Sequence, residues 1–150
     1  MEKDLDMLIY ELIFRVRLYR WSKNAAVKTE DLTERDMLLL EILSMKENMS
    51  ISDIAALYPN VSGSTISTTI TKLWKDKKLV NKTIFPENQR VTMVNLTDEG
   101  KRIVEQIQET DLKMYKTIST SLNLLSKHNE FFTRSIQKTI EFFDNQLGLR

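Results

Sequence analysis

The 150-residue chain contains no cysteine and only one histidine, His128. The absence of cysteine excludes disulfides, thiol redox switches and cysteine-ligated metal centres. One histidine is too few for a histidine-based metal or catalytic site, so we expect no metal and no cofactor, and we expect His128 to be a capping or solvated residue. No nucleophile stands beside a general base in a recognisable pattern, which predicts that the protein is not an enzyme.

Glycine and proline are also scarce. The three glycines, Gly63, Gly100 and Gly148, cannot form a glycine-rich loop that holds a phosphate, and with only two prolines the chain is expected to be rich in helix. No apolar run approaches the roughly 18 residues needed to cross a membrane. The first residues lack the basic start and the cleavage site of a signal peptide. These absences predict a cytoplasmic protein.

Over the whole chain, neither positive nor negative charge is in large excess, because there are 22 basic and 21 acidic residues. The total of +1 by itself argues against a basic nucleic-acid binder. The charge is unevenly distributed, however: residues 1–54 have a net charge of −3, residues 55–96 of +4 and residues 97–150 of 0. The central segment therefore has the positive charge that a surface needs to meet a phosphate backbone.

Two helix-start signals mark the beginning of this central part. Thr33-Glu34-Arg35-Asp36 resembles a capping box and precedes the apolar run 37–43. Ser50-Ile51-Ser52-Asp53 repeats the signal before a short helix, which Pro59 ends because the residue before a proline is disfavoured in the α conformation.

The residues that follow predict one more helix and a hairpin. Ser62 is a favourable N-cap for a helix that runs to about Lys77. Segments 79–85 and 90–96 are rich in β-branched residues and flank a four-residue tip, Pro86-Glu87-Asn88-Gln89. A short helix, a turn, a second helix and a trailing hairpin are typical of a winged helix-turn-helix.

Helical patterns flank this part on both sides. Residues 4–20 carry apolar side chains at helical spacing and are followed by a polar linker, 23–31. Two further long helices are expected after Thr97, with a break at 126–129. We therefore predict a mainly α fold with a small β-hairpin wing, in which a winged helix-turn-helix DNA-binding domain (33–96) lies between the two parts of a helical dimerisation region (1–32 and 97–150).

The helix after Ser62 is the candidate recognition helix. At about 100° per residue, Ile66, Ile70 and Leu73 share one face and predict the side that packs on the core. Small hydroxyl groups elsewhere on the helix suit close approach to a major groove, and lysines favour phosphates. A solvated helix surface is the alternative, although hydroxyl residues in 64–69 are poor helix formers. With the N-cap, the predicted DNA-binding residues here are Ser62, Ser64, Thr65, Thr68, Thr71, Lys72 and Lys75.

Several motifs resemble the MarR (multiple antibiotic resistance regulator) family. The resemblance covers nearly the whole chain and implies a homodimeric transcription regulator that binds a pseudo-palindromic operator on double-stranded DNA, most often as a repressor relieved by a small ligand. It also implies that the wing contacts DNA through Asn88, Gln89 and Arg90, with Arg90 in the minor groove. The motifs are Ser62-Gly63-Ser64-Thr65-Ile66-Ser67, Lys72-Leu73, Leu79-Val80, Pro86-Glu87-Asn88-Gln89-Arg90 and Leu96-Thr97-Asp98-Glu99-Gly100.

Two positions depart from the family pattern. Asn88 stands where the family has an aspartate, and an amide can accept a hydrogen bond from Arg90 but cannot neutralise its charge. Lys77-Lys78 stands where the family has a glycine. Either the connection to the wing is one residue longer, or a residue other than glycine adopts a costly backbone angle.

The flanking helices predict a dimer and a ligand site. Apolar stripes at Leu5–Tyr19 and Phe131–Phe143 exceed what a monomer of this layout could cover, which predicts a homodimer. Trp21 ends the first helix, near where the family places its effector cleft, and is the candidate for binding a small aromatic effector. Trp74 lies at the edge of the core face, where we expect it to pack.

Two functions remain in contention. The first is a sequence-specific DNA-binding regulator, and the second is a winged-helix protein-interaction module that does not bind DNA. The lysines of segment 72–82 favour the first, which also predicts DNA binding that weakens steeply with salt.

Overall fold

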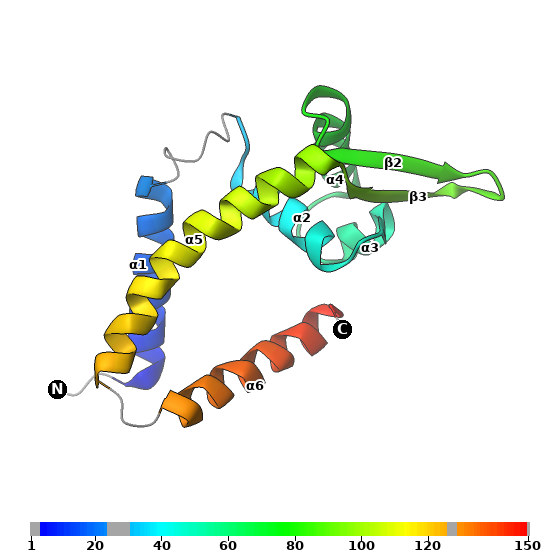
Figure 1. Ribbon diagram of the computed structural model, residues 1–150. Helices are drawn as coiled ribbons and strands as arrows, with labels where there is room; N and C mark the ends of the chain where they lie inside the picture. Colours follow the sequence, from blue (N-terminus) through cyan, green and yellow to red (C-terminus); the bar gives the residue numbers. More distant parts are fainter. Residues whose placement is uncertain (1–3, 24–30, 126–128, 150) are drawn as a thin grey trace. The chain divides into compact units, whose positions relative to one another are not determined.

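The computed structural model describes residues 4–23, 31–125 and 129–149. The chain divides into two compact units, Met1–Asp31 and Leu32–Arg150. The first unit contains the helix α1 (Leu5–Lys23), and the second contains every other described element (Figure 1). Most of the predicted linker and the residue His128 lie outside the described residues.

The second unit begins with helices whose starts were predicted correctly. Thr33 Oγ1 accepts a hydrogen bond from the Asp36 N–H at 3.2 Å, and Ser50 Oγ accepts one from the Asp53 N–H at 3.0 Å. Both capping boxes are complete, so backbone donors without an intrahelical partner are satisfied at each start. The elements in order are α2 (Glu34–Met45), β1 (Met49–Ser50), α3 (Ile51–Ala56), α4 (Gly63–Thr71) and the π-helical turn η2 (Lys72–Asp76).

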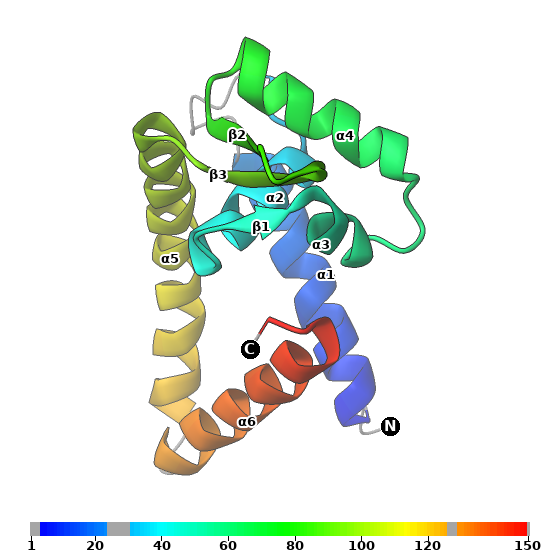
Figure 2. The same ribbon diagram turned by 90° about the vertical axis from the view of Figure 1, so that its right-hand side faces the viewer.

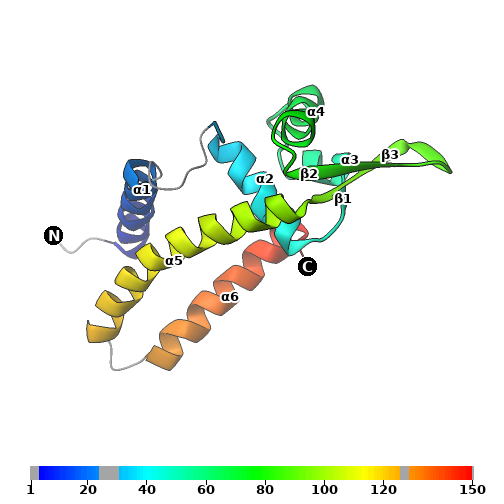
Figure 3. The same cartoon turned by 45° about the horizontal axis from the view of Figure 1, so that its top comes forward.

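The wing is the hairpin of β2 (Val80–Phe85) and β3 (Asn88–Leu96), which extends away from the helices of its unit (Figures 1 and 3). The two-residue strand β1 pairs with β3, which gives a three-stranded antiparallel sheet in the order β1-β3-β2. The sequence did not predict β1, because two residues are too few to show a strand periodicity.

The four-residue hairpin tip predicted from the sequence is wrong. Phe85 pairs with Asn88, so only Pro86 and Glu87 form the turn. An irregularity in the register between Ile84 and Phe85 allows β3 to begin two residues earlier than expected.

The apolar core of the second unit orients the candidate recognition helix. Ile66, Ile70 and Leu73 are 0% exposed, which confirms the predicted core face of α4 and its continuation. Burial of this face against the other elements leaves the opposite face in solvent. The largest fully buried side chains are Leu39, Leu40, Leu43, Ile54, Ile66, Ile70, Leu73, Val80 and Val94.

The long helices that follow the wing contribute little to this core. The first turns of α5 (Asp98–Leu125) bury Ile103, Val104 and Ile107. Beyond Ile107, no apolar side chain is buried among the described residues of α5 and α6 (Asn129–Leu147), and none is buried in the described part of α1. Within the described ranges, no helix is long and apolar enough to cross a membrane.

Candidate nucleic-acid interface

The start of α4 is built from hydroxyl groups. Ser62 is the N-cap, and its Oγ accepts a hydrogen bond from the Thr65 N–H at 3.2 Å. The same oxygen lies 3.0 Å from Ser64 Oγ and 2.7 Å from Thr65 Oγ1. The predicted N-cap is confirmed, and three hydroxyl groups lie close together at the first turn of the helix.

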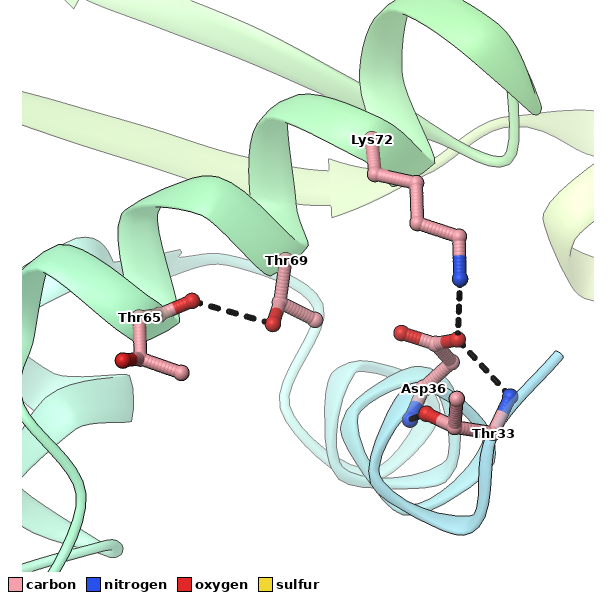
Figure 4. Close-up of polar contacts among 5 residues, drawn as sticks. All are labelled: Thr33, Asp36, Thr65, Thr69 and Lys72. Carbon is pink, nitrogen blue, oxygen red and sulfur yellow. Dashed lines mark hydrogen bonds and ion pairs between the residues drawn. The ribbon is translucent and has the colours of Figure 1, made fainter.

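The predicted reading face of α4 is largely open to solvent. Ser64, Thr68 and Lys75 are exposed, whereas Thr65 and Thr71 are half-buried. Thr68 Oγ1 donates to the backbone oxygen of Ser64 at 2.9 Å. Thr69 makes the same bond to Thr65 at 3.0 Å (Figure 4). Such bonds compete with the helix ladder and bend helices, and the π-helical turn η2 follows immediately.

Lys72 is turned toward α2. Its ammonium Nζ lies 2.7 Å from Asp36 Oδ2, and Asp36 is a buried residue (Figure 4). Asp36 Oδ2 also accepts a hydrogen bond from the Thr33 N–H at 2.8 Å. This ion pair ties the recognition helix to the start of α2. The contact of Lys72 with DNA stays a prediction.

The surroundings of Asp36 favour its ionised form. Burial by itself raises the pKa of a carboxyl group, but the hydrogen bonds from Lys72 and Thr33 outweigh it and hold the pKa of Asp36 below its ordinary value of 3.8. Because the carboxylate is paired and hydrogen-bonded, its burial is compensated.

The junction between η2 and the wing resolves the question of the missing glycine. Lys78 has a φ of +56°, in the left-handed region that glycine adopts without strain. Lys77 donates its N–H to the Lys72 oxygen at 3.1 Å, and Leu79 donates to the Leu73 oxygen at 2.9 Å. This end resembles a Schellman cap widened by the π-helical turn. A lysine therefore occupies the costly conformation.

The Leu-Thr-x-x-Gly motif fastens α5 to this junction. Thr97 Oγ1 donates to the Lys78 oxygen at 2.8 Å and accepts from the Gly100 N–H at 3.0 Å. A Cβ atom at Gly100 would lie 2.0 Å from the backbone oxygen of Leu79. The glycine is required because the first turn of α5 lies directly against the entry to the wing.

The wing side of the recognition helix carries a cationic cluster around Trp74. The ammonium groups of Lys75 and Lys82 lie 5.4 Å and 5.0 Å from the centre of the Trp74 ring, within the range of a cation–π interaction. Trp74 is 38% exposed, so it is packed over only part of its surface. Lys82 was not among the predicted site residues, although its charge contributed to the positive central segment.

The wing tip presents Arg90 to solvent. Asn88 Oδ1 accepts a hydrogen bond from the backbone N–H of Arg90 at 3.2 Å, so the amide stabilises the turn. Among the described residues, the guanidinium of Arg90 has no hydrogen bond or ion pair. The side chains of Gln89 and Trp21 lie outside the part of the chain that the structure describes.

Comparison with known proteins agrees with this geometry. Residues 32–100 match the family model described as a winged helix DNA-binding domain. The sequence has no significant match among curated proteins.

Three solved structures have the same fold. A mutant MepR from S. aureus is 21% identical, with 95% of this chain and 99% of that chain covered and a TM-score of 0.71. A mutant MarR from E. coli is 18% identical to this chain. The match covers 93% of this chain and 98% of that chain, with a TM-score of 0.65. NadR in complex with 4-hydroxyphenylacetate is 14% identical, covers 93% of both chains, and has a TM-score of 0.63.

A second mutant MepR was solved bound to an oligodeoxyribonucleotide and is 21% identical to this chain. The match covers 95% of this chain and 99% of that chain, with a TM-score of 0.60. The resemblance to MarR regulators that the motifs indicated is thus confirmed in the fold of nearly the whole chain. Residues 32–100 thus match a winged helix DNA-binding domain, and nearly the whole chain has the fold of the MarR and MepR structures.

Proposed function

We propose that this protein is a MarR-family transcription regulator that binds a pseudo-palindromic operator as a homodimer and represses transcription in the cytoplasm. The observation that carries the proposal is the pairing of an exposed, hydroxyl-rich α4 with a wing that presents Arg90. The MepR structure bound to an oligodeoxyribonucleotide supports it. Residues 33–96 would contact DNA, while 1–32 and 97–150 would form the dimer.

A dimer would explain the uncovered apolar surfaces. Phe131 is 74% exposed and Leu5 is 66% exposed, which is costly for side chains of this kind in water. A second copy of the chain would bury such surfaces and present two recognition helices to successive major grooves, about 10 base pairs apart or a multiple of that.

We further propose that a small aromatic acid relieves repression. The complex of NadR with 4-hydroxyphenylacetate supports this class of ligand. An effector that binds the DNA-free form more tightly than the DNA-bound form would release the operator. Trp21 stays the candidate contact for it.

Selection of bound duplexes from a random pool, with and without 4-hydroxyphenylacetate, tests the function directly. The selected site should be an inverted repeat, and its affinity should fall steeply with salt. Arg90→Ala should weaken binding and reduce the salt slope, whereas Thr68→Ala should change the preferred sequence more than the slope. A wild-type protein that enriches no duplex would contradict the proposal.

A further inference from the structure

We propose that a cavity between the recognition helix and the wing binds one phosphate of the DNA backbone. The proposal rests on the function proposed above and adds Ser52, Ser67 and Thr92 to the residues that contact DNA. Figure 2 shows β1, α3, α4 and β3 gathered in one part of the molecule. The cavity is lined by residues of these four elements, and its volume is about 410 Å³.

The lining of the cavity has the chemistry of an anion site. Its polar side chains are four hydroxyls and one guanidinium, and no carboxylate lines it; they belong to Ser50, Ser52, Ser67, Arg90 and Thr92. Hydroxyl groups and guanidinium are the donors that proteins use for phosphate oxygens.

Most of these donors are available to a ligand. Ser52, Ser67 and Arg90 are exposed. Ser50 Oγ already accepts the Asp53 N–H at 3.0 Å, but its own hydroxyl proton remains able to donate. The carboxylate of the nearby Asp53 is held by the Ser50 N–H at 3.3 Å and does not line the cavity.

The position of the cavity matches the geometry of DNA. A helix in the major groove and a wing in the adjacent minor groove must straddle the sugar–phosphate strand that separates the two grooves. Ser67 lies on the edge of α4 that faces the wing, because it lines the same cavity as Arg90 and Thr92 of β3. The strand that passes between helix and wing therefore meets Ser67 on one side and Arg90 on the other.

In this arrangement, one group of residues would contact the bases and another would contact the phosphate. Ser64 and Thr68 lie on the outward face of α4 and would meet base edges, while Ser67 and the wing residues would fix the register of the helix in the groove. Contacts to phosphate carry no base preference, so the cavity should contribute affinity without contributing sequence specificity.

Charge insertion at the cavity tests the proposal. Ser67→Asp and Ser52→Asp are compared with Ser44→Asp, an exposed serine on α2 that is outside the cavity. Binding is measured for the selected operator and for a scrambled duplex. We expect both cavity variants to lose about tenfold or more in affinity for the two duplexes by the same factor, and Ser44→Asp to bind as wild type does.

Neutral phosphates give a second measurement that does not depend on inserted charge. Single methylphosphonates are placed in turn along the strand between the major-groove and minor-groove contacts. One position should weaken wild-type binding but have no further effect on Ser67→Ala, because the same contact is already lost.

The outcomes separate the two proposals. Wild-type binding with unaffected cavity variants, or a loss confined to the selected sequence, would overturn the phosphate site and leave the regulator intact. Failure of the wild-type protein to bind any duplex would overturn both. Urea unfolding of each variant excludes a loss of fold as the cause of weak binding.

Discussion

Gly100 is the residue at which the fold tolerates an added atom least. The Leu79 oxygen that would meet a new Cβ at 2.0 Å also accepts the Thr97 N–H at 3.0 Å, so neither backbone can move freely. We expect Gly100→Ala to lower the free energy of unfolding by about 1–3 kcal/mol. Gly63→Ala is the matched control, because no atom lies within 4 Å of its Cβ, and it should be stabilising by about 0.5–1 kcal/mol.

Urea denaturation of both variants measures the difference. Equal effects at the two glycines would show that close approach is not the reason for a glycine at position 100.

The ion pair between Lys72 and Asp36 predicts a pH dependence of stability. The folded-state pKa of Asp36 is depressed, so its contribution to stability is fully present above the unfolded pKa and is lost as the pH falls through the folded value. Lys72→Met should cost about 1–3 kcal/mol at neutral pH. It should also flatten the fall in stability between about pH 5 and pH 2.

Lys75→Met removes the same charge at an exposed position and serves as the control. Denaturation across that pH range should give parallel curves for Lys75→Met and wild type. If Lys72→Met is also parallel to wild type, the pair does not set the pKa of Asp36.

At the scale of elements, the end of η2 stores strain in one residue. A left-handed conformation costs a residue with a Cβ about 1–2 kcal/mol. Lys78→Gly should therefore raise the free energy of unfolding by about 0.5–1 kcal/mol, after the greater freedom of glycine in the unfolded chain is counted.

Lys77→Gly is a close control, because it removes one lysine charge from a residue with an ordinary φ of −95°. It should destabilise the protein by up to about 1 kcal/mol. Thermal or urea unfolding that ranks the two variants in the opposite order would contradict the assignment of strain to Lys78.

Which elements could be predicted depended on the range of the interactions that form them. Capping residues such as Ser50 and Ser62 act on amides three residues away, so the sequence indicated the helix starts. The core face of α4 followed from the spacing of Ile66 and Ile70. Conversely, the strand β1 exists only because Met49 lies opposite Val94, a partner that no local pattern indicates.

The candidate site was predicted less completely than the fold. Helical spacing identified which side chains leave the core, but not where their ends go. The turn of Lys72 toward Asp36 depends on a residue 36 positions away, and the cavity beside Ser67 requires residues 90–92 of β3 to lie next to α4. These placements follow from tertiary packing, which a single sequence does not display.

At the scale of the whole molecule, assembly should depend on the apolar stripe of α6. Ile140 is 50% exposed and shares its face with Phe132 and Ile136. Ile140→Glu should convert a dimer to a monomer, because a charge would be buried without a partner at the interface. Operator affinity should fall with it, since each half-site would then be bound separately.

Gln137→Glu adds the same charge on a neighbouring face of the helix and is the control. Sedimentation at several protein concentrations distinguishes the two variants. A monomeric wild-type protein, or an Ile140→Glu variant that remains dimeric, would show that α6 is not the interface.

The hydrogen bond from Thr68 back to Ser64 restricts the bases that α4 can accept. Its hydroxyl proton is used inside the helix, so toward DNA this residue offers an oxygen acceptor and a methyl group. Guanine presents only acceptors at its major-groove edge, whereas adenine and cytosine present amino donors and thymine presents a methyl group. Thr68 is thus mismatched to guanine, and the half-site should hold adenine, cytosine or thymine at the position that it contacts.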